Sequence, residues 1–307
     1  MSDTASLSGG SSPTGMITFK LYGPSATAGC SGTPLSDQTV AVSGNSSYTT
    51  PAGVLLGQAG TYWWTASYGG DAGNTPAASG CGAEQVIISP LASPTFSTTP
   101  TPGGPVGALV LDTAALLGGS SPTGTITFNL YGPSATANCS GTPVDTETVT
   151  VTGNGGYSTP AGATPSQAGT YWWTASYSGD ARNNPAASGC GAEQVTISKV
   201  TLGFATGAGP GGPVGTLVID FAALEGGDNP TGTITFNLYG PSATASCSGT
   251  PVDTETVTVT GNGSYRTPAG ATPSQAGTYW WTASYSGDTN NAPAVSGCGQ
   301  ESVTLSP

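Results

Sequence analysis

The chain has 307 residues, of which only 7% are charged, and its 16 acidic and 4 basic residues give a net charge of −12. Without clustered Lys or Arg, this composition excludes binding to nucleic acid through its phosphates and docking on an anionic membrane. No apolar stretch is long enough to cross a bilayer, so we expect no membrane insertion. Glycine (49) and proline (25) are abundant, which predicts short strands joined by turns.

One segment of about 108 residues occurs three times. The second and third copies, compared over Pro122–Asp180 and Pro230–Asp288, differ only at Asn138/Ser246, Gly156/Ser264 and Ser158/Arg266. A looser first copy covers Pro13–Asp71. This period predicts three domains, at residues 1–90, 91–198 and 199–307. Stalks, fibres and multivalent binders gain reach or avidity from such repetition, whereas enzymes rarely need one site three times.

The third copy represents the pattern of predicted elements. Most of its predicted strands alternate between apolar and polar residues, and small or turn-forming residues separate them. An Asn-Gly pair tolerates the positive φ angles of a hairpin turn. About seven short strands in about 108 residues predict a β-sandwich of immunoglobulin type. The elements are the strands Thr216–Phe221 and Thr233–Leu238, the loop Ser242–Thr250, the strand Thr254–Thr260, the hairpin turn Gly261–Ser264, and the strands Thr278–Tyr285 and Gln300–Leu305.

The first copy is shorter than the others at its start. Leu91–Leu111 and Thr201–Ile219 supply the first two strands of the second and third copies, but Asp3 already aligns with Asp112. We therefore expect the first repeat to lack its first two strands and to expose an apolar cleft and a free sheet edge. Two explanations stay open: upstream sequence of a longer protein completes the unit, or a strand from a neighbouring chain fills the gap.

Six cysteines fall two per copy, and the members of each pair are 51 residues apart. A zinc site would need four ligands, and the chain has neither histidine nor a CxxC motif. We expect three disulfides within the copies, and hence an extracellular or cell-surface location. Paired but reduced buried thiols are the alternative. The pairs are Cys30 with Cys81, Cys139 with Cys190, and Cys247 with Cys298.

Alternation divides the aromatic residues of Thr278–Tyr285 between two faces. The apolar face carries Trp281, so this residue and its equivalents Trp64 and Trp173 are predicted to lie in the core near the disulfide. The opposite face carries the candidate interface or ligand residues. Three interpretations of these stay open: cover by the cysteine loop or a neighbouring module, lateral contact between chains, and stacking on a sugar ring. The candidates are Trp63, Trp172 and Trp280.

The acidic residues give no sign of a metal or catalytic site. Asp71, Asp180 and Asp288 each lie in a Gly-Asp turn, where Asp is expected for the turn itself. A calcium site would need several convergent oxygens, and no DxDxDG-like loop is present. Without histidine, and with isolated carboxylates, no nucleophile–base pair is visible. We therefore expect no metal, no cofactor and no enzymatic activity.

The motifs GTITF, TVTVTGNGSY and AGTYWWTASYSGD, in this order, resemble the bacterial Ig-like repeats (group 3-like) of cell-surface and secreted proteins. The resemblance covers essentially all of the second and third copies and most of the first. The cysteine pair, the double tryptophan and the longer loop at Tyr239–Thr250 depart from the family pattern. The resemblance implies an extracellular array and no catalytic residue. The expected function is a structural stalk or a fibre-forming, self-associating segment; the alternative is an adhesin that binds a glycan or a host protein through the outward tryptophans.

Overall fold

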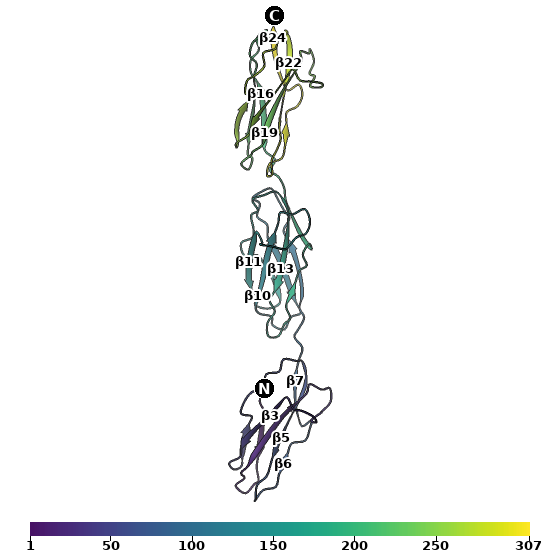
Figure 1. The fold of residues 1–307 in the computed structure, drawn as a ribbon, viewed down its shortest axis with the longest axis vertical. Coiled ribbons are helices and arrows are strands. Elements are labelled where there is room, and N and C mark those ends of the chain that lie inside the picture. Colours follow the sequence, from purple (N-terminus) through teal and green to yellow (C-terminus); the bar gives the residue numbers. More distant parts are fainter. The chain divides into compact units, whose positions relative to one another are not determined.

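The computed structural model describes residues 1–307 and is all-β, with 24 strands. No helix in it could span a membrane. The chain divides into two compact units, Met1–Ala92 and Ser93–Pro307. The first unit corresponds to the first copy of the repeat, and the second unit contains the other two copies. Each unit is described by itself, with the strand labels of Figure 1.

The third copy forms two sheets. One has the order β16-β18-β21, and the other has the order β17-β24-β22-β19-β20, with β23 paired to β22. All pairs are antiparallel except β17 with β24, which is parallel. The strands are β16 (Gly203–Ala208), β17 (Gly212–Pro213), β18 (Asp220–Glu225), β19 (Thr233–Tyr239), β20 (Asp253–Thr258), β21 (Gly263–Arg266), β22 (Gly277–Tyr285), β23 (Ala294–Val295) and β24 (Glu301–Ser306).

The second copy repeats this arrangement, with sheets β12-β9-β8 and β11-β10-β13-β15 and with β14 paired to β13. The parallel pair is reduced here to a single bridge between Pro105 and Ser198. The strands are β8 (Thr95–Pro100), β9 (Asp112–Leu117), β10 (Thr125–Tyr131), β11 (Asp145–Thr150), β12 (Gly155–Ser158), β13 (Gly169–Tyr177), β14 (Ala186–Ala187) and β15 (Glu193–Ile197).

The first copy has the same strands except those at its start. Its sheets are β1-β4 and β3-β2-β5-β7, with β6 paired to β5. Nothing within residues 1–92 corresponds to β8 or β16. The strands are β1 (Thr4–Leu7), β2 (Met16–Tyr22), β3 (Ser36–Ala41), β4 (Ser46–Thr49), β5 (Gly60–Tyr68), β6 (Ala77–Ala78) and β7 (Glu84–Ile88).

Alternating side chains from both sheets build one hydrophobic core per copy. In the third copy, Leu224 comes from one sheet, and Phe236 and Trp281 come from the other; all three are fully buried. The prediction that Trp64, Trp173 and Trp281 lie in the core is confirmed. Two sheets packed over a shared core are the arrangement of a β-sandwich.

Two predicted elements of the third copy were wrong. The predicted strand Thr216–Phe221 overlaps β18 only at Asp220 and Phe221, because a turn at Gly215, with φ +86°, comes just before it and pairing with β16 begins only at Asp220. Gly261–Ser264 does not join a hairpin, because β20 pairs with β19 while β21 pairs with β18. The Asn-Gly segment therefore carries the chain from one sheet to the other.

The cysteines form the three expected pairs, each 51 residues apart in sequence. Each disulfide joins the loop after the second sheet's central strand (β2, β10 or β19) to the turn before its last long strand (β7, β15 or β24). The expected position beside the core tryptophan was wrong. Cys190 is exposed and Cys139 is half-buried, and no cysteine belongs to a core cluster. The bonds therefore hold surface loops together.

Candidate functional site

The first copy leaves one sheet edge open. β1 pairs only with β4, whereas its equivalents β9 and β18 each lie between two strands. The backbone of Thr4–Leu7 on the side away from β4 has no strand partner. An edge of unpaired N–H and C=O groups can accept another strand.

Core residues beside this edge are only partly covered. Ala5 and Leu7 are half-buried, whereas their equivalents in the second copy, Ala114 and Leu116, are fully buried. On β7, Val86 and Ile88 are also half-buried, but the equivalent residues of β15 and β24 are buried. The first and second copies carry the same residue at each of these four positions, so the difference in burial comes from the missing cover.

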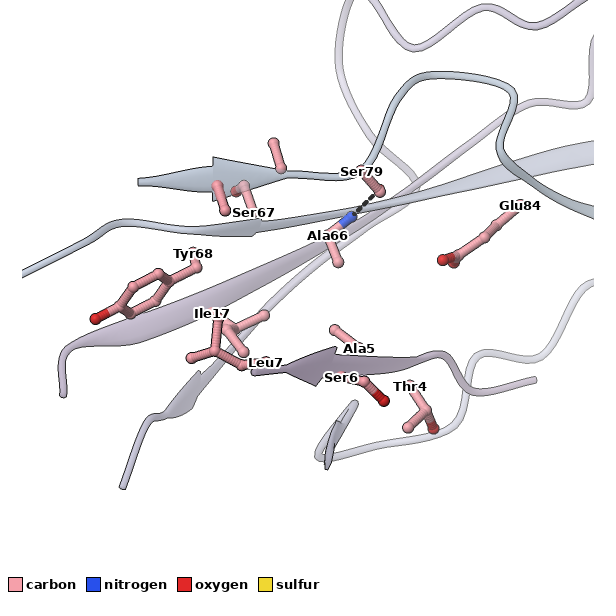
Figure 2. Close-up of a pocket in the computed structure, with 12 residues that line it drawn as sticks. Thr4, Ala5, Ser6, Leu7, Ile17, Ala66, Ser67, Tyr68, Ser79 and Glu84 are labelled. Atoms are coloured by element: carbon pink, nitrogen blue, oxygen red, sulfur yellow. Dashed lines mark hydrogen bonds between the residues drawn. The ribbon is translucent and has the colours of Figure 1, made fainter. Parts of the chain in front are cut away.

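Ala5 and Leu7 line a groove of about 430 Å³ between β1 and the edge formed by β5 and β6. Figure 2 shows Leu7 beside Ile17 at one end of the groove and the Glu84 carboxyl group at the other. On the far wall, the Oγ of Ser79 accepts a hydrogen bond of 2.9 Å from the Ala66 N–H. The wall formed by β5 is therefore held in place without an occupant.

The equivalent space in the other copies is occupied by a strand. In the second copy, β8 pairs with β9 and also contacts β13, β14 and β15. Its Phe96 packs against the core cluster, as does Phe204 of β16 in the third copy. The groove of the first copy thus lies where β8 and β16 lie in the other two copies.

In each copy, a pair of carboxyl groups lies at one end of this groove or of the strand that fills it. Asp112 and Glu193 are buried together, and one oxygen of each has no hydrogen-bond partner. Burial and the nearby Asp112 raise the pKa of Glu193 to about 8. In the first copy, burial and Asp3 raise the pKa of Glu84 to about 7. Ionising both carboxyl groups of a pair in an apolar site costs free energy, because the two negative charges repel each other. Each pair therefore holds a proton near neutral pH.

These carboxyl pairs are not among the sites predicted from the sequence. The signal was present, because Glu193 lies on the same face of β15 as Val195 and Ile197. An acidic residue on the core face of an alternating strand indicates a buried carboxyl group with a partner.

The tryptophans on the outer face offer little surface to a ligand. Trp63 and Trp172 are each 8% exposed, and Trp280 is half-buried. Each indole N–H donates a hydrogen bond to the start of the cysteine loop. Trp63 bonds to Ser25 Oγ at 3.1 Å, and the other two bond to equivalent serine carbonyl oxygens. A sugar ring could stack on these indoles only by displacing the loop.

The Gly-Asp turns use their carboxylates within the fold. Asp180 accepts hydrogen bonds from the Thr123 N–H at 2.6 Å and from the Tyr177 hydroxyl at 3.0 Å. Asp71 and Asp288 make the same contacts in their copies. No group of three or more Asp, Glu, Cys or His residues is placed to hold a metal ion. These aspartates connect the turn to the segment that precedes β2, β10 or β19 in the same copy.

Comparison with known proteins adds no relative. No protein-family model matches the chain, and no curated protein matches it in sequence.

Proposed function

We propose that the chain is a structural segment of an extracellular bacterial protein, a stalk or fibre-forming array of three tandem Ig-like domains. Three similar copies, each with two sheets and a disulfide, support this proposal. The order of strands in the sheets, including the parallel pairing of a short early strand with the last strand, is typical of Ig-like sandwiches. Three disulfides fit an oxidising compartment outside the cell.

The open groove of the first copy carries the second part of the proposal. A segment built of such units can lengthen or branch by strand addition, in which a strand of another molecule completes the first copy. The adhesin alternative is weaker, because the tryptophans on which it depends are covered.

Single-molecule stretching of the purified chain tests the structural role. A stalk should unfold in discrete steps, one for each sandwich. With the disulfide intact, the 51-residue separation between paired cysteines stays locked. Reduction should therefore lengthen each step by about 180 Å, at roughly 3.5 Å per residue. A smooth extension without steps, or steps of unchanged length after reduction, would contradict the proposal.

A further inference from the structure

The two occupied grooves hold segments with one shared pattern. We name Thr95–Gly107 and Gly203–Gly215 the leading segments. Both read x-Phe-x-Thr-x-x-x-Pro-Gly-Gly-Pro-Val-Gly. Outside this pattern the two leading segments differ at every position, although the domains that follow them are nearly identical. The shared positions are therefore the ones that the groove selects.

The phenylalanine is the first anchor. Phe96 lies opposite Leu116 in the antiparallel pair of β8 with β9, and Phe204 lies opposite Leu224 in the same register. Both rings pack against the core clusters. The residue equivalent to Leu116 in the first copy is Leu7, which is half-buried and lines the groove.

The Gly-Gly-Pro-Val stretch is the second anchor. Val106 donates its N–H to Ser198 O at 3.1 Å, and Ser198 donates its N–H to Gly104 O at 2.8 Å. A Cβ on Gly103 would lie 1.8 Å from Thr196 O, so only glycine allows the backbone to approach β15 this closely. In the third copy, a Cβ on Gly211 would lie 2.0 Å from Thr304 O.

The first copy offers both anchor sites unoccupied. Its groove presents Leu7 and the outer edge of β1 to a phenylalanine-bearing strand. At the other site, Ser89 is the equivalent of Ser198, and it follows directly after β7. Its backbone has no hydrogen-bond partner within the first unit.

We infer that the groove of the first copy binds a polypeptide segment of the leading-segment pattern other than the two that are already paired in their own copies. The donor pairs antiparallel with β1, with its phenylalanine opposite Leu7. Its Gly-Gly-Pro-Val stretch then runs parallel to the end of β7 and bonds to Ser89. This inference rests on the proposed role of the chain as an extendable array, and it names the partner of that array.

The donor must carry a leading segment that does not already fill a groove. This chain has two leading segments, and both fill grooves of their own copies. Moving either one into the first copy would open the groove that it leaves, so exchange among existing segments yields no net pairing. An unseated segment gains all of its contacts on binding.

Binding of a synthetic peptide to the full chain tests the inference. The probe is a fluorescent peptide with the sequence of Thr95–Gly107, and its anisotropy is followed as the chain is added. We expect saturable binding at one site. A matched peptide with serine in place of the phenylalanine should bind roughly tenfold more weakly or worse, because it loses the burial of the ring. A second peptide with alanine at the position of Gly103 should not saturate.

A chain variant with a filled groove provides the control. Replacing Met1-Ser2 with the sequence of Ser93–Leu111 places a leading segment ahead of Asp3, in the same spacing that it has ahead of Asp112. This variant should lose peptide binding. Hydrogen exchange identifies the site: in the native chain, the peptide should protect Thr4–Leu7 and Ser89.

Equal binding of all three peptides, retained binding by the filled variant, or protection at β9 or β18 in place of β1 would each overturn the inference. Self-association of the chain without peptide, with protection of β1, would show that exchange between copies fills the groove, and would overturn the requirement for an unseated donor. If the chain unfolds in discrete steps under force but does not bind the peptide, the proposed structural role stands and the proposed partner is rejected.

Discussion

The buried carboxyl pairs should make the domains more stable in mild acid than at alkaline pH. In the third copy, Asp220 is fully buried and Glu301 is nearly so, and burial together with Asp220 raises the pKa of Glu301 to about 8. The reference value is 4.5. Folded and unfolded chains are both protonated at this group below that value, so its stabilising contribution is complete there. The contribution is lost as the pH rises through the folded pKa.

The structure gives the size of the effect. One pKa unit corresponds to about 1.4 kcal/mol. A full shift from 4.5 to about 8 would amount to about 5 kcal/mol, and relaxation and partial solvation reduce this, so we expect the free energy of unfolding to fall by roughly 2 kcal/mol. In Glu301→Gln the amide can donate to Asp220 and carries no charge. The free energy of unfolding of this variant should equal that of the native chain near pH 4.5 and be larger near pH 8.

Urea unfolding at both pH values measures the effect, with the NMR signals of Trp281 as the reporter of the third copy. Glu225→Gln removes an exposed carboxylate from the same copy and serves as the control, with little expected change in the pH dependence. The reasoning would be refuted if the native third copy were as stable at pH 8 as at pH 4.5, or if both variants shifted the profile equally.

Three further predictions concern the second copy. Replacing Cys139 and Cys190 together by serine should lower its free energy of unfolding by about 4 kcal/mol, from the chain entropy of the released loop; a urea midpoint equal to that of the native chain would contradict this. Gly103→Ala should release the segment from β15, raising hydrogen exchange at Ser198, whereas unchanged exchange would show that the close approach is dispensable. Hydrogen bonds from Thr123 and neighbouring groups hold the pKa of Asp180 well below its usual value, so its contribution is lost as pH falls. Asp180→Asn should therefore reduce the acid sensitivity of this turn in amide exchange, and an unaltered profile would oppose that assignment.

Much of the fold could be predicted from the sequence where one strand carries enough information by itself. The alternation in β19 and β22 identified the core face correctly, including Trp281. Copy counting predicted the missing strands, because Asp3 and Asp112 align. Short strands escaped prediction: β17 has two residues and is defined by its neighbour β24, not by its own sequence. The sequence predicts a turn at Gly263 and Ser264, where β21 begins, because the partner of β21 is β18, which lies far before it in the chain and leaves no local signal.

The candidate site was only partly predictable for the same reason. The missing strands predicted an apolar cleft in the first copy, but they did not predict the sequence pattern of the segment that fits it. The role of Gly103 depends on its distance from Thr196, which lies far along the chain. The carboxyl pair of Asp3 and Glu84 joins residues from opposite ends of the first copy, and only the fold brings them together.

Hydrogen exchange at β1 tests the central claim most directly. In the free chain, the amides of Thr4–Leu7 that face away from β4 should exchange rapidly, while those of β9 that bond to β8 stay protected. Addition of the Thr95–Gly107 peptide should slow exchange in β1 to the level of β9. Protection of the outer β1 edge that is complete without peptide, or unchanged by it, would contradict an open groove that binds a donor strand.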